Sequence, residues 1–370
     1  MTESEAYVAL NMLPKVGPGR VRRLVDALGS AAAALRTSRD GLMRVEGVGA
    51  DVASVIADWE SHADLTAELA AARDMAVRLL TPADDGYPEN LRNIYDPPLA
   101  LYVKGGFETR DRRGIAVVGS RQTSYYGREM ARRLGYQLAY AGMTVVSGLA
   151  RGVDTHAHEG AIAAKGRTIA VLGCGIDQLY PPENRLLAEK VAEAGALVSE
   201  FPIGTKPDRQ TFPIRNRVVA GMSLGVLVVE APRSSGALIT ARMALDQGRQ
   251  VFAVPGRVDS PHARGCHQLI KEGARLVEGV EDVLAEFEFL IPGIGKSPMP
   301  RPPERGDETA QQIGGEEAAI LRALGSDERH IDEIIRICGL PPAKVSSSLL
   351  QLELRRLVRS LPGKYFVRLD

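Results

Sequence analysis

Residues 225–247 read GVLVVEAPRSSGALITARMALDQ, and this stretch decides the fold of the larger part of the chain. It starts with an apolar run that is mostly valine, passes through a turn containing Pro, Ser and Gly, and ends in a helical pattern. A short apolar strand followed by such a turn and a helix is the repeating unit of a parallel sheet with helices on both faces. Glycine and small hydroxyl residues after a strand also let backbone N–H groups face an anion at the next helix start.

The same pattern recurs between residues 110 and 290 and predicts an α/β fold with a doubly wound parallel sheet. The expected strands are 115–118, 144–147, 168–172, 197–200, 226–230 and 251–254. The expected helices are 128–141, 185–194, 217–222, 237–247 and 280–288. Ligands of such sheets bind beyond the carboxyl ends of the strands. We therefore expect a sheet domain over residues 81–290, with its site at that edge.

Residues 1–80 predict a small helical domain of the helix-hairpin-helix or SAM type, because two glycine-containing turns, LPKVGPGRV at 13–21 and VEGVGADV at 45–52, each lead into a helix. Glycines at such a turn let backbone amides approach a phosphate. Lys15 and Arg20 make the first turn a candidate DNA contact, whereas the second turn carries acidic residues that would repel DNA. A packing module without DNA contact is the alternative.

The C-terminal part predicts a flexible linker at 291–315, rich in Pro, Gly and charge, and then a winged helix at 316–370. Three helical patterns, 316–324, 331–338 and 342–358, precede a hairpin at 359–369. Its basic half could contact double-stranded DNA, and protein interaction or simple packing are the alternatives. The candidate contacts there are Lys344, Arg355 and Arg356.

Composition limits the function classes. The 370 residues carry 46 Lys and Arg against 46 Asp and Glu, so a nucleic-acid site must be a local patch. The three cysteines are far apart, which argues against a zinc site or a disulfide framework and fits a reducing cytoplasm. The acidic start without a long apolar run predicts neither a secretion signal nor a membrane span. Aromatic residues make up only 5%, so binding of single strands should depend mainly on phosphates.

The loops that follow the expected strands carry the candidate binding residues, because these loops meet at one edge of a parallel sheet. Residues 201–217 contain four basic residues against one acidic residue, a local net charge of +3. Three alternatives stay open: Arg121 could pair with Glu230, Asn216 could cap a helix, and Phe212 could be core or a ring for stacking a base. The candidates are Gly119, Ser120, Arg121, Ser147, Gly148, Lys206, Phe212, Arg215, Asn216, Arg217, Ser235 and Gly236.

The sequence lacks the motifs of a nucleotide enzyme. The first strand is followed by Gly-Ser-Arg and not by G-x-G-x-x-G, and no G-x-x-x-x-G-K-[ST] loop occurs. Ser147 has no G-x-S-x-G frame, and Asp154, which we expect to be an N-cap, forms no acid–base pair with His156 or His158. We therefore predict a binding protein with neither catalytic residues nor a cofactor.

Ordered motifs over about half of the chain resemble the bacterial DNA-processing protein A family, also called DprA or Smf. They are YPENLRNIYDPP at 87–98, VGSR at 118–121, SGLARGVD at 147–154, YPPEN at 180–184, FPIRNR at 212–217, SGALITA at 235–241, AVPG at 253–256 and GCHQLI at 265–270. This resemblance implies an extended Rossmann fold that binds single-stranded DNA without catalysis. It also implies protection of incoming strands in natural transformation, loading of RecA in homologous recombination, and a cytoplasmic homodimer formed through the Rossmann domain.

Carried onto this sequence, the resemblance gives phosphates to Arg121 and Lys206 and a base to Phe212. A pocket holding about four phosphates should show a log–log salt slope of about −3, since single strands contribute about −0.7 per phosphate. Two alternatives remain. One is a Rossmann-type enzyme acting on nucleotide phosphates, although VPGR at 254–257 lacks the P-G-G-x-G-T loop of such enzymes. The other is a duplex-binding regulator that works through the winged helix.

Overall fold

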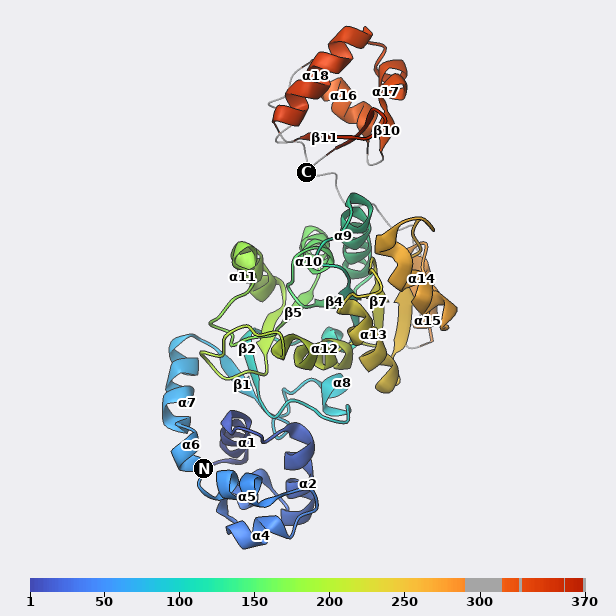
Figure 1. Cartoon of the computed structure of the whole chain (residues 1–370). Coiled ribbons are helices and arrows are strands. Elements are labelled where there is room, and N and C mark those ends of the chain that lie inside the picture. The colour runs from blue at the N-terminus through green and yellow to red at the C-terminus, as the bar shows by residue number, and fades with distance from the viewer. Residues whose placement is uncertain (290–314, 326–327, 356, 369–370) are drawn as a thin grey trace. The chain divides into compact units, whose positions relative to one another are not determined.

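The computed structural model describes residues 1–289, 315–325, 328–355 and 357–368, and these residues fall into two compact units (Figure 1). The first unit holds the helical N-terminal part and the large sheet, and the second holds the C-terminal residues. The predicted linker at 291–315 lies outside the described residues except for Gly315.

The first unit is built on a nine-stranded sheet with the order β1-β2-β6-β5-β4-β3-β7-β8-β9. The seven strands from β6 to β9 in this order run parallel, and β1 and β2 add an antiparallel edge. The strands are β1 (Arg78–Leu80), β2 (Leu101–Gly105), β3 (Gly114–Val118), β4 (Thr144–Ser147), β5 (Thr168–Leu172), β6 (Ala196–Ser199), β7 (Gly225–Val228), β8 (Gln250–Ala253) and β9 (Arg275–Leu276). The doubly wound sheet is confirmed, and each of the six expected strands is present within two residues at either end.

Helices cover both faces of this sheet (Figure 1). One face packs on α8 (Glu89–Arg92), α12 (Thr211–Gly221), α13 (Ala237–Asp246) and α14 (Arg264–Lys271). The other packs on α9 (Tyr125–Tyr140), α10 (Val153–Ala163) and α15 (Val280–Glu286), and α11 (Arg185–Ala194) covers the end near β6. Side chains alternate between these faces along each strand, so Ile115 and Val117 contact one set of helices while Ala116 and Val118 contact the other.

Seven short helices form the N-terminal part and pack around their own apolar core. They are α1 (Glu3–Met12), α2 (Pro18–Leu28), α3 (Ala31–Arg36), α4 (Arg39–Met43), α5 (Ala50–Ala57), α6 (Trp59–His62) and α7 (Leu65–Asp74). The Asn11 side chain donates a hydrogen bond to the Glu200 carbonyl (2.9 Å). The Glu68 carboxylate accepts from the Tyr102 hydroxyl (2.6 Å) and from the Ile203 N–H (2.9 Å). These bonds join the helical part to the sheet within one unit.

The first glycine turn lies between α1 and α2. Lys15 Nζ is 3.9 Å from the Asp51 carboxylate on α5, and Arg20 donates to the Lys15 carbonyl (2.9 Å). Both side chains therefore have a partner inside the helical part, and their contact with DNA stays a prediction.

The sheet begins at Arg78 in β1, slightly ahead of the expected domain start at 81.

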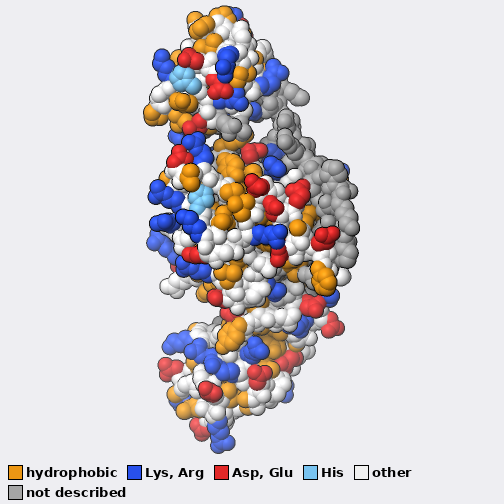
Figure 2. All heavy atoms as spheres, turned by 90° about the vertical axis from the view of Figure 1, so that its right-hand side faces the viewer, with side chains coloured by type: hydrophobic (Ala, Val, Ile, Leu, Met, Phe, Trp, Pro, Cys, Tyr) orange, Lys and Arg blue, Asp and Glu red, His pale blue; other side chains and the backbone are white. Residues whose placement is uncertain are grey.

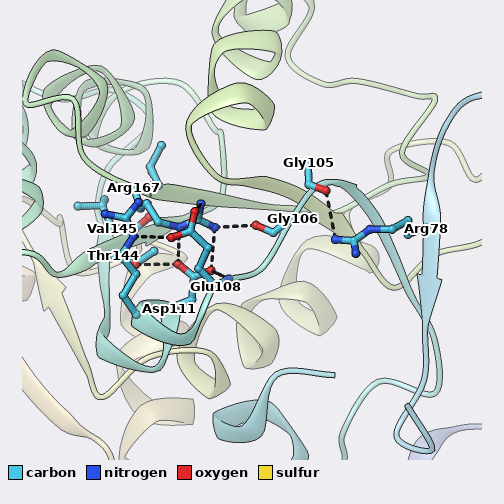
Figure 3. Close-up of polar contacts among 10 residues, drawn as sticks. Arg78, Gly105, Gly106, Glu108, Asp111, Thr144, Val145 and Arg167 are labelled. Atoms are coloured by element: carbon cyan, nitrogen blue, oxygen red, sulfur yellow. Dashed lines mark hydrogen bonds and ion pairs between the residues drawn. The ribbon is translucent and has the colours of Figure 1, made fainter. Parts of the chain in front are cut away.

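A buried ion-pair network ties the amino ends of β4 and β5 to the segment that precedes β3 (Figure 3). Arg167, only 7% exposed, donates to both carboxylate oxygens of Asp111 (2.8 Å each), to Glu108 (2.7 Å) and to the Gly106 carbonyl (2.6 Å). The Thr144 hydroxyl donates to Asp111 as well (2.9 Å). A bidentate arginine–carboxylate pair adds geometric specificity as well as interaction energy. This network lies at the end of the strands opposite the candidate site.

The C-terminal unit is a winged helix, as predicted. Helices α16 (Glu316–Leu324), α17 (Ile331–Cys338) and α18 (Pro342–Leu354) pack on a sheet with the order β10-β12-β11, made of β10 (Arg329–His330), β11 (Val358–Leu361) and β12 (Tyr365–Arg368). Lys344 pairs with Glu316, and Arg355 pairs with Glu317 at 3.0 Å. Arg356 lies outside the described residues. None of the helices in the described ranges combines the length and the apolar character that crossing a bilayer requires.

Candidate nucleic-acid interface

The loops after β3, β4, β5, β6 and β7 meet at the carboxyl edge of the sheet, where the strand order reverses between β3 and β7. Gly119 begins the loop after β3. A Cβ atom there would lie 2.5 Å from the Val153 side chain and 2.8 Å from the Glu230 carbonyl, so only glycine fits. The Ser120 N–H donates to the same Glu230 carbonyl (2.7 Å). The backbone directly before Arg121 is therefore held by its contacts with Val153 and Glu230.

Two arginines and two aromatic rings form a spatial row across this edge. The Arg121 guanidinium carbon is 4.7 Å from the Phe212 ring centroid, within cation–π distance. The Phe212 ring is 5.9 Å from the Tyr180 ring and tilted by 50° to it, and Arg151 lies 6.0 Å from the Tyr180 ring. Both rings are partly exposed and both arginines are exposed. The edge thus presents partly exposed ring faces beside exposed cations.

Arg215 lies beneath these loops and not among them. It is 5% exposed, donates to the Val171 carbonyl, and fills the space that a side chain at position 148 would need, since a Cβ on Gly148 would lie 2.0 Å from it. The buried Asp154 carboxylate accepts from the N–H groups of Gly148 (3.1 Å) and Ala150 (3.3 Å). Burial raises the pKa of Asp154, and the Arg215 charge opposes this shift.

Arg217 is buried too. At 7% exposure it pairs with Glu200 and, at 3.2 Å, with Asp96 in the loop before β2. Burial raises the pKa of Glu200, while Arg217 lowers it. Helix α12 starts at Thr211, six residues before the expected start, so Asn216 is a mid-helix residue and not a cap. Its side chain accepts from Arg215 Nε (3.2 Å). Both buried arginines hold α12 and its neighbouring loops in place.

Known proteins share this architecture and these motifs. Residues 78–288 match the family described as DNA recombination-mediator protein A, and residues 298–364 match the DprA winged helix domain. Protein Smf of Synechocystis sp. is 34% identical over 401 residues, which cover 99% of each chain. The chain belongs to the DprA family. Protein Smf of Escherichia coli is 42% identical over 77% of this chain and 76% of its own.

Two solved DprA structures are similar as well. DNA processing protein A of Streptococcus pneumoniae matches with a TM-score of 0.69 and 34% identity, covering 78% of this chain and 99% of that one. The Helicobacter pylori protein, whose structure is described as giving insight into its single-stranded DNA binding mode, matches with a TM-score of 0.51 and 28% identity over 57% and 95%. The resemblance to DprA inferred from the motifs is therefore confirmed.

The other candidates of this DprA chain differ in accessibility. Lys206 and Gly236 are exposed, and Ser235 is partly buried with its hydroxyl accepting from the Ala237 N–H (3.3 Å). The Ser147 hydroxyl is buried and donates to the Val117 carbonyl (2.6 Å). The Ser120 hydroxyl is likewise engaged by the backbone of Gln122. These two serines shape the loops and leave the exposed positions to meet a ligand.

The sequence interpretation missed Tyr180, Arg151 and their neighbour Glu183. Tyr180 follows β5 in the loop that ends at Asn184, whose amide donates to the Leu149 carbonyl (2.9 Å) and so ties this loop to the one after β4. The signal was present, because both loops follow expected strands. The motifs SGLARGVD at 147–154 and YPPEN at 180–184 were used for the family resemblance, but no binding role was given to Arg151, Tyr180 or Glu183.

Several titratable groups of the sheet domain are buried. His158 is fully buried beside Thr168 (2.7 Å), and burial lowers its pKa to about 3. Burial also raises the pKa of the Cys174 thiol to about 11. Asp154 is not the expected N-cap, since Gly152 takes that position in α10. Within the described ranges, His, Cys, Asp and Glu side chains form no group of three or more suited to a metal ion.

Proposed function

We propose that the chain binds single-stranded DNA along the carboxyl edge of the sheet, without a chemical reaction. The observation that carries the proposal is the row Arg121–Phe212–Tyr180, in which an exposed cation lies over one of two contacting, partly exposed rings. Stacking on rings and charge attraction to the backbone are the two interactions with which proteins hold single strands independently of sequence. The H. pylori relative supports the choice of ligand.

The residues divide into those that contact DNA and those that position them. Arg121 and Lys206 take backbone phosphates, and Phe212 supports a base. Gly119 and Gly148 let the backbone pack closely against Val153 and Arg215, where a Cβ atom would collide. Arg215 and Arg217 act from beneath, since buried partners occupy their guanidinium groups. The exposed residues should therefore determine how DNA affinity depends on salt, and the buried arginines should contribute to the stability of the fold.

The family assignment supports a cellular role that follows from this binding. The protein would protect incoming single strands in the cytoplasm during natural transformation and load RecA on them, acting as a homodimer through the Rossmann domain. Figure 2 shows the side of the first unit that carries α13, α14 and α15, where apolar side chains lie among Lys and Arg. Exposed apolar residues that suit a dimer contact are Ile239 and Leu245 on α13, Val258 in the loop after β8, and Leu276 in β9.

Two other functions are less well supported. An enzyme acting on nucleotide phosphates would need a P-G-G-x-G-T loop, which VPGR at 254–257 lacks, and the acid–base candidates Asp154 and His158 are buried. A duplex-binding regulator would use the winged helix, where Lys344 and Arg355 are paired with acidic residues. A protein ending at residue 289 separates the two DNA-binding functions, because single-strand affinity should then survive the loss of the winged helix.

Fluorescence anisotropy of labelled oligo-dT at several salt concentrations tests the proposal. Arg121→Ala should weaken binding about 10- to 100-fold, the range expected for one charge-assisted contact, and make the salt slope less negative by about 0.7. Arg112→Ala is the matched control, because Arg112 is an exposed arginine paired with Glu89 (2.9 Å) at the opposite end of the strands. Equal binding by wild type and Arg121→Ala would refute this placement of the site.

A further inference from the structure

The two cation–ring pairs at the carboxyl edge differ in one respect. Arg121 lies over Phe212 and makes no ion pair among the described residues, whereas Arg151, near Tyr180, is paired with the Glu183 carboxylate. Both members of this second pair are about half exposed, Arg151 by 54% and Glu183 by 51%. The second pair therefore lies at the surface, where a DNA phosphate can reach it.

The backbone places Arg151 directly beside the Gly119-Ser120-Arg121 turn. The Val153 N–H donates to the Ser120 carbonyl (3.2 Å), and a Cβ on Gly152 would lie 2.2 Å from that same carbonyl oxygen. On the other side, the Asn184 amide donates to the Leu149 carbonyl and to the Thr155 hydroxyl (2.8 Å). Hydrogen bonds between the three loops thus hold Arg121 close to Arg151, Tyr180 and Glu183.

We propose that Arg151 is a second phosphate site of the single-strand interface and that Glu183 occupies it in the DNA-free protein, so that a backbone phosphate must displace the Glu183 carboxylate. This inference rests on the proposed function and adds an internal competitor to it. A carboxylate and a phosphate present similar oxygen pairs to a guanidinium. Glu183 therefore takes the geometry that a phosphate takes after exchange.

The energies favour such an exchange. An exposed ion pair contributes little because water and salt screen it, so separating Arg151 from Glu183 costs little. A phosphate in contact with the chain releases condensed counterions, which the intramolecular carboxylate does not do. The Glu183 charge nevertheless opposes an approaching strand. Its cost is an affinity penalty that increases as the salt concentration falls.

The test is a double-mutant cycle on oligo-dT binding by the full chain, with wild type, Glu183→Gln, Arg151→Gln and the double variant. Glu183→Gln should tighten binding about two- to fivefold at low salt, the range of an exposed ion pair. Arg151→Gln should weaken binding and make the salt slope less negative by about 0.7. In the Arg151→Gln background, Glu183→Gln should change the Kd little.

Glu89→Gln is the matched control, because it removes one exposed carboxylate that is paired with an arginine far from this edge. An equal gain from Glu183→Gln with and without Arg151 would overturn the proposal, since the effect would then be general charge repulsion. An unchanged salt slope in Arg151→Gln would overturn it as well.

The outcome for Arg121→Ala separates failure of this inference from failure of the proposed function. Wild-type binding that Arg121→Ala weakens, combined with no coupling between Arg151 and Glu183, refutes only the exchange. Absence of binding by wild type refutes the DNA site and the exchange together.

Discussion

Replacing Arg215 by methionine should destabilise the fold strongly, because it leaves the Asp154 carboxylate buried without its neighbouring cation. Removing one partner of a buried charge pair costs about 3–5 kcal/mol, a large share of the roughly 5–15 kcal/mol that keeps a domain folded. With a urea m-value of about 1–3 kcal/mol per M, the unfolding midpoint should fall by about 1–5 M. The methionine side chain is close to that of arginine in length, so the loss of the positive charge should dominate the change in stability.

The loss should depend on pH in a defined direction. Burial raises the pKa of Asp154 in the folded protein above its unfolded value of about 4. A group with a raised folded pKa contributes stability that is complete below the unfolded pKa and is lost as pH rises through the folded pKa. Without Arg215 this pKa should rise further. The deficit of Arg215→Met relative to wild type should therefore grow from about pH 4 toward neutral pH.

Urea unfolding followed by far-UV circular dichroism measures this deficit, because the single tryptophan, Trp59, lies in the helical N-terminal part and reports on a different region. Asp154→Asn in the Arg215→Met background should recover about 2 kcal/mol or more, since it removes the unpaired charge. Arg242→Met, at an exposed position on α13, is the control. A midpoint for Arg215→Met equal to that of wild type at pH 7, or no recovery in the double variant, would refute the reasoning.

Two further predictions separate stacking from charge and the site from the fold. Phe212→Leu should cost about 1–3 kcal/mol of single-strand binding, the range for one stacked base, with an unchanged salt slope in the anisotropy titration; a changed slope would show that the ring acts through Arg121. Arg167→Met should lower the unfolding free energy by about 3 kcal/mol, because it leaves the buried Asp111 unpaired, and calorimetry should show this loss while oligo-dT affinity of the folded protein stays unchanged. Weaker DNA binding by this variant would contradict the placement of the site at the opposite end of the strands.

The parallel core of the sheet could be predicted from sequence because its strands are buried on both faces and appear as continuous apolar runs. Three strands escaped prediction. β2, at the antiparallel edge, begins within the buried apolar run 99–103 and was not recognised as a strand, whereas β1 and the two-residue β9 have no such run. For a related reason no bounds were predicted for helix α10, although Asp154 was expected to cap a helix there. Gly160 on this helix lies so close to α9 that a Cβ would be 2.2 Å from the Arg132 carbonyl, so small residues replace the large apolar ones that mark a helix face.

Sequence could place the binding loops at one edge but could not separate surface arginines from buried ones. Arg215 and Arg217 contribute two of the four positive charges counted in residues 201–217, and both are occupied inside the protein. The expected helix start at 217 was six residues late and left Arg215 in a loop, whereas α12 begins at Thr211 and contains both arginines on its buried side. The error in one boundary thus became an error in the assignment of two charges.

The expected salt slope of about −3 is affected by this correction. Its four phosphates cannot be held by the four basic residues of 201–217, since only Lys206 and Arg209 of those are exposed. Together with Arg121 they give three exposed cations, and three phosphate contacts correspond to a slope of about −2. Arg151 is a fourth exposed cation, but it contributes only if a phosphate displaces Glu183. A wild-type slope near −3 that becomes less negative, about −2, in Arg151→Gln would therefore indicate four phosphate contacts, with the fourth supplied by the loop after β4.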